Sequence, residues 1–270
     1  MIQDIRHHDK WYNEMAEKES FFKYLSSETA LTVLSNFTLK YTNTLDFNDP
    51  FDYNPAFTNQ GLSKFMKRVG ENNNIRIPRK LAIKNSKILT TDEFRREASS
   101  EFSVTCFSKS PHIVPMWAHY ADCHRGCVLG FGQASLEELE KMFRSSEWLW
   151  NSVTDYLIPQ DVKYTEKRPT LFNSEGLTNF RENGYDAYLI KAKAWEYEQE
   201  VRVIKMKPAG IYPFEVSQLR SVRFGLNIDP IIRKQIIKLV TSIKTTNKIK
   251  IRLFDVKLDH REFLLNDVRC

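Results

Sequence analysis

Short strand-like runs and amphipathic helical runs are interleaved along this chain without the regular strand–helix–strand order of a parallel sheet. "FSVTCFS" (102–108) alternates and is rich in aromatic and β-branched residues, which predicts a strand. "SETALTVLSNF" has apolar residues at helical spacing behind Ser26 or Ser27 as N-cap, which predicts a helix. We therefore expect an α+β fold with mainly antiparallel sheets and peripheral helices.

The 270 residues are close to the upper limit for one domain, and we expect a single domain over 1–270. Residues 62–98 are predicted to be a basic, mostly helical insertion. Such a segment can contact an anionic polymer such as nucleic acid, or it can be a solvated helical face. Positions 64 to 96 contain only three acids but ten bases. The bases are Lys64, Lys67, Arg68, Arg76, Arg79, Lys80, Lys84, Lys87, Arg95 and Arg96.

Composition excludes several classes of protein. A hydrophobic content of 41% and an aromatic content of 13% are typical of a packed globular protein. No apolar stretch approaches the length of a membrane span, and the first residues lack a signal-peptide pattern. Four cysteines without secretory spacing fit a reducing compartment, so a cytoplasmic protein without membrane contact is expected, and its oligomeric state stays open.

"WEYEQEVR" (195–202) alternates charged with aromatic or aliphatic residues and is predicted to be a strand. Glu196, Glu198, Glu200 and Arg202 would then share one face. A solvated edge strand explains this pattern, and so does the polar floor of an active-site cleft.

"MWAHYAD" (116–122) supplies a second group of candidates. His119 and Tyr120 can hydrogen-bond ligand hydroxyls or phosphates. Alternatively, Trp117 and Tyr120 belong to the core and His119 pairs locally.

Two possible ligand sets have structural alternatives. Asn48, Asp49 and Asp52 could bind a metal or a ribose hydroxyl, or they could form an Asx-turn before and after Pro50. Four further side chains, His119, Cys123, His124 and Cys127, have spacings that could suit zinc. They lack a clean C-x-x-C pair, so we expect no metal.

Three motifs occur in order, namely "NDPFD" (48–52), "MWAHYAD" and "WEYEQEVR". With a "VKY" strand and "VRFGLN", they make the chain resemble, over about residues 20–257, a bacterial family catalogued only as a domain of unknown function. The resemblance supplies no activity, but it selects residues for attention: Asn48, Asp49, Trp117, His119, Tyr120, Gly126, Glu198, Glu200 and Arg202.

The layout is also similar, at the level of the fold, to the ADP-ribosyltransferase superfamily, which includes DNA-modifying toxins. The elements that carry this resemblance are a first strand with Lys23, a strand ending in Phe107–Ser108 and the Glu198–Glu200 pair. It implies that NAD is the substrate, and it suggests a toxin or phage-defence role.

On this resemblance, Glu200 is the catalytic carboxylate and Glu198 activates or orients the acceptor, while Tyr120 stacks on or hydrogen-bonds the nicotinamide. The remaining candidates would bind NAD or hold the glutamates: Lys23, Ser108, His119, Trp117, Arg202, Asn48 and Asp49.

The rival hypothesis is structural. Glu198, Arg202 and His119 would form a buried network that fixes the sheet. Function would then be nucleic-acid binding through Lys64–Arg96, or a nuclease-like activity.

Overall fold

The computed structural model describes residues 18–54, 56, 59–73, 78, 91–135, 137–140, 155–172 and 187–270. The sequence also predicts helices over 9–19, 135–145 and 176–194, and most of the residues of each lie outside the described ones. Residues 74–77 and 79–90 of the basic segment 62–98 lie outside them as well.

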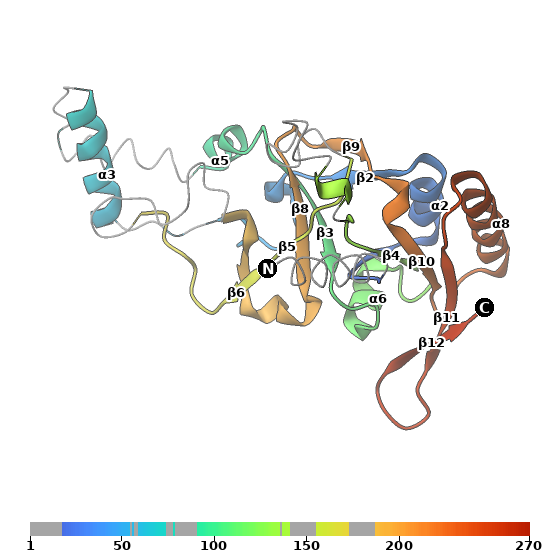
Figure 1. The fold of residues 1–270 in the computed structure, drawn as a ribbon. Helices are drawn as coiled ribbons and strands as arrows, with labels where there is room; N and C mark the ends of the chain where they lie inside the picture. Colours follow the sequence, from blue (N-terminus) through green and yellow to red (C-terminus); the bar gives the residue numbers. More distant parts are fainter. Residues whose placement is uncertain are drawn as a thin grey trace, which may run out of the picture.

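The centre of the fold is an eight-stranded sheet with the strand order β12-β11-β10-β4-β1-β3-β8-β5 (Figure 1). All neighbours are antiparallel except β10 and β11. The predicted α+β class with mainly antiparallel sheets is confirmed. The strands are β1 (Phe21–Leu25), β3 (Ser103–Ser108), β4 (Cys127–Phe131), β5 (Gln160–Asp161), β8 (Glu200–Lys205), β10 (Leu219–Phe224), β11 (Arg252–Leu258) and β12 (Leu265–Arg269).

Helices cover both faces of this sheet. On one face, α2 (Ser27–Asn36) and α8 (Pro230–Asn247) enclose the main core together with Phe21. On the other face, α6 (Val114–Tyr120) packs on Phe22. Successive β1 side chains point to opposite faces, so one strand supplies both cores.

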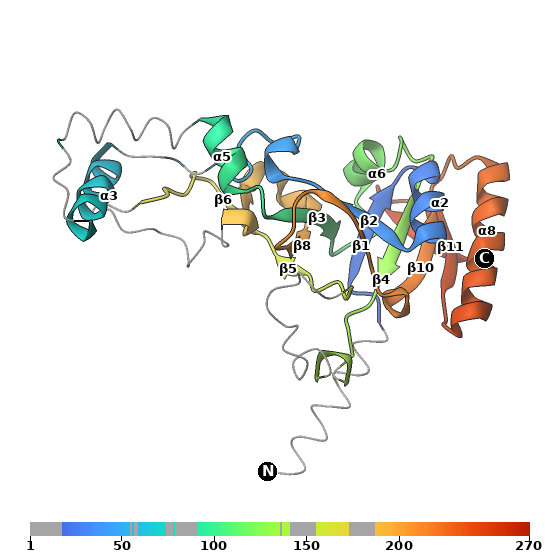
Figure 2. The ribbon, with the colours of Figure 1, turned by 90° about the horizontal axis from the view of Figure 1, so that it is seen from above.

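Two small sheets flank the large one (Figure 2). In one, β2 (Thr38–Tyr41) pairs antiparallel with β9 (Gly210–Pro213). In the other, β6 (Lys163–Thr165) pairs parallel with β7 (Ile190–Ala192). The helix predicted over 176–194 is therefore wrong at its C-terminal end, where β7 forms.

Within the basic segment, two helices are described: α3 (Asn59–Asn72) and α5 (Asp92–Ala98). Figures 1 and 2 both place α3 at the far end of an extension, away from the large sheet. Its role as an insertion in a single domain stays a prediction.

The strand predicted over 195–202 is only half correct. Residues Lys193–Glu198 form the 3-10 helix η4, which ends at Gln199 in a left-handed conformation with φ of 48°. Only from Glu200 does the chain become a strand, β8. Glu196 is therefore exposed on the 3-10 helix and does not share a face with Glu200.

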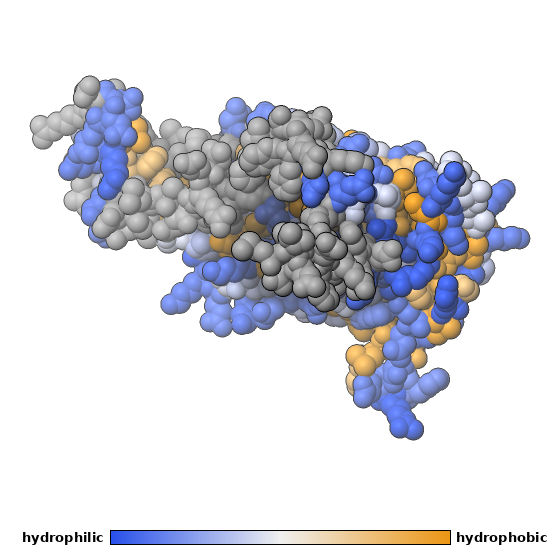
Figure 3. Space-filling view, in the orientation of Figure 1, coloured by the Kyte–Doolittle hydropathy of each residue, from blue (hydrophilic) through white to orange (hydrophobic). Residues whose placement is uncertain are grey.

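Shorter 3-10 helices are η1 (Thr44–Asp46) and η5 (Val216–Gln218). The hairpin joining β11 and β12 projects from the body and carries the fully exposed Phe263 (Figure 3). Among the described residues, no helix combines the length and apolar character that a membrane crossing requires.

Candidate functional site

The edge of β3 that faces β1 is only partly paired, and the candidate site opens there. Both strands are described along their whole length, and their register contains one pair, Phe22↔Ser108. Further along β3, Thr42 bridges to Val104 instead. Between these two points Lys23 crosses the gap, and its Nζ donates to the Cys106 carbonyl at 2.6 Å.

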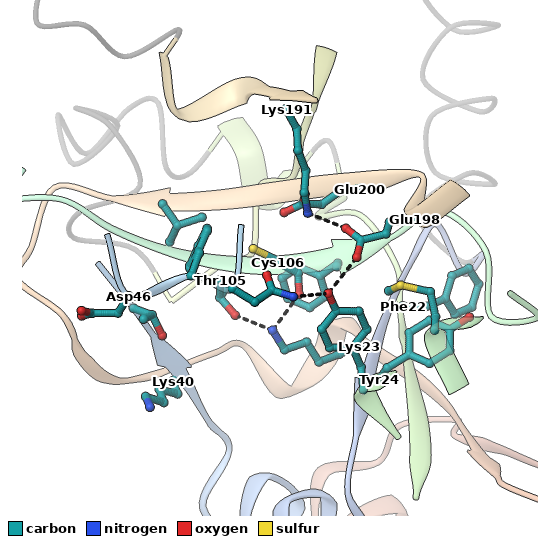
Figure 4. Close-up of a pocket in the computed structure, with 17 residues that line it drawn as sticks. Phe22, Lys23, Tyr24, Lys40, Asp46, Thr105, Cys106, Lys191, Glu198 and Glu200 are labelled. Carbon is teal, nitrogen blue, oxygen red and sulfur yellow. Dashed lines mark hydrogen bonds and ion pairs between the residues drawn. The ribbon is translucent and has the colours of Figure 1, made fainter. Parts of the chain in front are cut away.

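A cavity of about 390 Å³ occupies this gap, within the usual range for small-molecule sites. Figure 4 shows Lys191 reaching Glu198 and Glu200 from one side, with Lys40 and Asp46 on the side away from Glu198. The polar and charged residues that line it are Lys23, Tyr24, Lys40, Thr42, Asp46, Asn48, Thr105, Tyr120, Lys191, Glu198 and Glu200.

The two glutamates converge on one ammonium group. Lys191 Nζ lies 2.5 Å from Glu198 Oε2 and 2.9 Å from Glu200 Oε2. Burial lowers the pKa of Lys191, but the two carboxylates outweigh burial and raise it above its ordinary value. Lys191 is therefore charged at neutral pH and holds both carboxylates at the cavity wall.

Behind the cavity wall, Arg202 clamps Glu200 from β8. Arg202 Nε donates to Glu200 Oε1 at 2.7 Å, and its two terminal nitrogens donate to Asp52 at 2.7 and 2.6 Å. Burial opposes ionisation of Glu200, but the charges of Arg202 and Lys191 prevail and lower the pKa of Glu200 to about 2. Glu200 is therefore a permanent negative charge at physiological pH.

Tyr120 links α6 to the carboxylates. Its hydroxyl donates to Glu198 Oε1 at 2.8 Å and accepts from Asn48 Nδ2 at 3.1 Å. Burial, and then the hydrogen bond to Glu198, raise the pKa of Tyr120. The phenol therefore stays protonated and can donate to a carboxylate or to a ligand oxygen.

Lys23 lies at the cavity wall without a carboxylate partner in the described part of the chain. Its Nζ donates to Thr105 Oγ1 at 2.9 Å and to the Cys106 carbonyl, both uncharged acceptors. Burial lowers the pKa of Lys23. An anionic ligand would offset this effect, because it stabilises the charged ammonium.

Several predicted site residues do not line the cavity. Trp117 is buried, and its Nε1 donates to the Pro111 carbonyl at 2.8 Å. His119 is exposed, with its ring 6.3 Å from the Tyr120 ring. Neither side chain forms a hydrogen bond or ion pair with Glu198 or Glu200.

Two further candidates support the site from behind. Ser108 Oγ donates to the Glu198 carbonyl at 2.7 Å, which fixes the end of η4 against β3. Asp49 is buried in an Asx-turn, with its Oδ1 accepting from the Phe51 amide at 2.9 Å. The structure therefore brings together Glu198, Glu200, Tyr120, Lys23 and Asn48 at the cavity, with Arg202 behind them.

Sequence reasoning missed Lys191, which pairs with both glutamates, and assigned it to a helix. It also missed Tyr164, whose hydroxyl accepts from the Glu200 amide at 2.7 Å. The only sequence signal for Lys191 is a lysine within the apolar run "AYLIKAKAW", because a lysine that becomes buried needs a partner.

No cluster of three or more His, Cys, Asp or Glu side chains suited to a metal ion exists within the described residues. His119, Cys123, His124 and Cys127 are all described and do not form such a group.

The family comparison matches the part of the chain that carries the site. Residues 116–203 match the family described as protein of unknown function (DUF2971). The matched segment contains the "MWAHYAD" and "WEYEQEVR" motifs, whereas "NDPFD" lies before it. No curated protein and no solved structure matches the chain.

The DUF2971 match therefore covers Tyr120, Lys191, Glu198, Glu200 and Arg202. It does not reach Lys23 on β1, which closes the same cavity. The match supplies no activity, and the similarity to ADP-ribosyltransferases finds no confirmation in these comparisons.

Proposed function

We propose that this chain is an enzyme that binds NAD in the β1–β3 cavity and breaks the bond between nicotinamide and ribose. ADP-ribose would pass to an acceptor or to water. One observation carries this proposal: two carboxylates (Glu198 and Glu200), a phenol (Tyr120) and a lysine that has no carboxylate partner among the described residues (Lys23) meet at a single cavity.

The chemistry requires a negative charge beside the ribose. When the bond from C1′ to the nicotinamide nitrogen breaks, its electron pair goes to the ring, and positive charge develops on the ribose. Glu200 is ionised with a pKa of about 2, so it can stabilise this charge without first losing a proton. The acceptor oxygen or nitrogen then bonds to C1′ and releases its proton.

The other residues have complementary roles. Glu198 can take the proton of the acceptor or hold a ribose hydroxyl, and Tyr120 positions Glu198 through their 2.8 Å hydrogen bond. Lys23 can hold the pyrophosphate, because its acceptors among the described residues, Thr105 Oγ1 and the Cys106 carbonyl, are uncharged. Arg202 positions Glu200 from behind the cavity.

The proposal is tested by incubating the purified protein with NAD and measuring release of nicotinamide by chromatography. Labelled NAD and a panel of protein, DNA and RNA acceptors would identify the acceptor. We expect Glu200→Gln to reduce turnover at least 100-fold. Glu196→Gln is a matched control, because Glu196 is exposed on η4 and lies outside the cavity lining.

A second variant keeps the proposal testable if Glu200→Gln fails to fold. Tyr120→Phe removes only the hydroxyl of a half-buried side chain, and it should lower turnover while circular dichroism stays unchanged. The proposal is overturned if the wild-type protein releases no nicotinamide, or if a folded Glu200→Gln variant turns over at the wild-type rate.

A second candidate is the structural hypothesis, which the closed ion pair between Arg202 and Asp52 favours, since both side chains are fully buried. Glu200 would then stabilise the fold, and function would be nucleic-acid binding through Lys64–Arg96. On this alternative, Glu200→Gln lowers stability and the wild-type protein has no NAD turnover. A toxin or phage-defence role is compatible with either candidate.

A further inference from the structure

The helix α8 carries bases and no acid. Its sequence, "PIIRKQIIKLVTSIKTTN", contains one arginine and three lysines. Its apolar side, with Ile236, Val240 and Ile243, is buried in the main core. The opposite side is exposed and basic, and in Figure 3 hydrophilic side chains project at the right-hand edge, where Figure 1 places α8.

The exposed side of α8 forms a stripe at helical spacing. Lys234 and Lys238 are one turn apart, Thr241 follows, and Lys244 and Lys248 are again one turn apart. At 1.5 Å per residue, the stripe from Lys234 to Lys248 is about 21 Å long.

This stripe leads into a basic groove of about 600 Å³ at the C-terminal end of α8. Strands β10, β11 and β12 supply the opposite wall. Among the described residues, no acid lines the groove, and the cationic residues that line it are Arg220, Lys244, Lys248, Lys250, Arg252 and Arg269. It lies at the β12 side of the sheet, whereas the Glu198–Glu200 cavity lies towards β8.

Most of the charges in the groove do not form an ion pair with another described residue. Arg252 is neutralised by Glu19 at 2.6 Å, and the Arg220 guanidinium donates to the Ser217 carbonyl. By contrast, Lys244, Lys248, Lys250 and Arg269 are exposed, and none of them forms an ion pair with another described residue.

Helix stability does not explain the stripe. Cations in the last turn interact favourably with the helix dipole, but Lys234 and Lys238 lie far from that end. Like charges one turn apart repel each other, by a few tenths of a kcal/mol per pair. The helix retains one such pair, Lys234/Lys238, and Lys244 is followed by Lys248 at the C-cap, with no acid in between.

We propose that the stripe and groove bind the phosphate backbone of a nucleic-acid duplex. A duplex carries one charge per about 1.7 Å of axis with both strands counted, so a length of about 21 Å contains about 12 phosphates, enough for the bases of the stripe to contact. A membrane surface fits less well, because a helix that lies on a bilayer inserts its apolar face. The apolar face of α8 is already buried in the core.

The test is fluorescence anisotropy of the full chain with a labelled 20-base-pair DNA duplex of random sequence, from 50 to 200 mM salt. Six exposed bases of the stripe and groove form no ion pair with another described residue: Lys234, Lys238, Lys244, Lys248, Lys250 and Arg269. At roughly 0.9 per phosphate contact, they give a slope of log K against log salt of about −5. Removing three of them in Lys244→Gln/Lys248→Gln/Lys250→Gln should bring the slope to about −3 and weaken binding at least tenfold at 100 mM salt.

The matched control removes three bases from α3 in Lys64→Gln/Lys67→Gln/Arg68→Gln. It should keep the wild-type slope. Circular dichroism shows whether each variant is folded. We expect the α8 variant to fold, because Lys244, Lys248 and Lys250 are exposed.

Any one of three results would overturn the proposal. The first is that the wild-type protein does not bind the duplex at 50 mM salt, and the second is that the α8 variant binds with the wild-type slope. The third is that the α3 variant loses as much affinity as the α8 variant. Binding to phosphatidylserine vesicles without binding to the duplex would also overturn it, in favour of a membrane surface. NAD turnover does not enter this readout.

Discussion

Replacing Arg202 by Met should destabilise the fold by about 3–5 kcal/mol, the usual cost of removing one partner of a buried ion pair. Arg202 donates two hydrogen bonds to Asp52, and also bonds Glu200 and the Tyr188 carbonyl. In the variant, Glu200 keeps its ion pair with Lys191, whereas both carboxylate oxygens of Asp52 lose their hydrogen bonds from the Arg202 guanidinium. The loss should therefore arise mainly at Asp52.

The control is Arg125→Met. Arg125 also bonds an aspartate through two nitrogens, with its Nη2 2.9 Å from Asp122 Oδ1, but both side chains are exposed. Exposed pairs contribute about 0–1 kcal/mol, so this variant should be nearly neutral.

Urea unfolding at pH 7, followed by tryptophan fluorescence, measures both variants against the wild-type protein. If Arg202→Met is too unstable to purify, Asp52→Asn removes one charge with little change of shape and should still destabilise measurably. In a double mutant of the two, the loss should be at least about 1 kcal/mol smaller than the sum of the single losses. Losses of equal size for Arg202→Met and Arg125→Met would refute the assignment of a buried, tightly coupled pair.

Three further predictions concern pH and local geometry. Because the pKa of Glu200 falls from 4.5 to about 2 on folding, it contributes about 3 kcal/mol above pH 4.5 that is lost as the pH falls towards 2. The wild-type protein should therefore lose more stability than Glu200→Gln between pH 5 and pH 2 in urea titrations, and parallel curves would contradict this. Gly126→Ala should cost about 1–3 kcal/mol in thermal unfolding, because a Cβ would lie 2.9 Å from the Ala121 carbonyl oxygen and closer still to that of Leu25. Ser26→Ala should cost about 1 kcal/mol, because Ser26 caps α2 by accepting from the Thr29 amide at 3.2 Å, and an unchanged urea midpoint would disprove the contribution of this cap.

Elements with strong local patterns were predicted correctly from the sequence. The strand "FFKYL" and the helix behind Ser26 form as expected, because apolar spacing and an N-cap act within one segment. The strand at 102–108 begins one residue later, at Ser103. The turn around Asp49 also forms, with its side chain bonding the backbone two residues on.

The site could be predicted only in part. Glu198 and Glu200 were found from their spacing, but Gln199 takes a left-handed conformation, so the two reach Lys191 from a 3-10 helix and a strand rather than from one strand. Lys191 itself depends on the pairing of β6 with β7, which are far apart in the sequence. No local pattern specifies such a pairing.

Lys23 illustrates the same limit on the opposite wall. Its place on β1 follows from a strand-like run in the sequence, and the resemblance to ADP-ribosyltransferases suggested a ligand contact. Its actual acceptors, on Thr105 and Cys106, exist only because β1 and β3 part after a single pair. Such a departure from regular pairing is a property of the assembled sheet.

The parting of β1 and β3 gives the sheet a seam. On one side the ladder runs without a break from β12 to β1, and on the other from β3 to β5, so each half is a stiff plate. Across the seam, the backbone register is reduced to one pair, Phe22↔Ser108, and the remaining contacts are made by side chains such as the Lys23 ammonium and the rings of Phe21 and Phe107. Any bending of the sheet should therefore concentrate at this seam. It would widen or narrow the cavity between β1 and β3 before it changed the strand pairing within either half of the sheet.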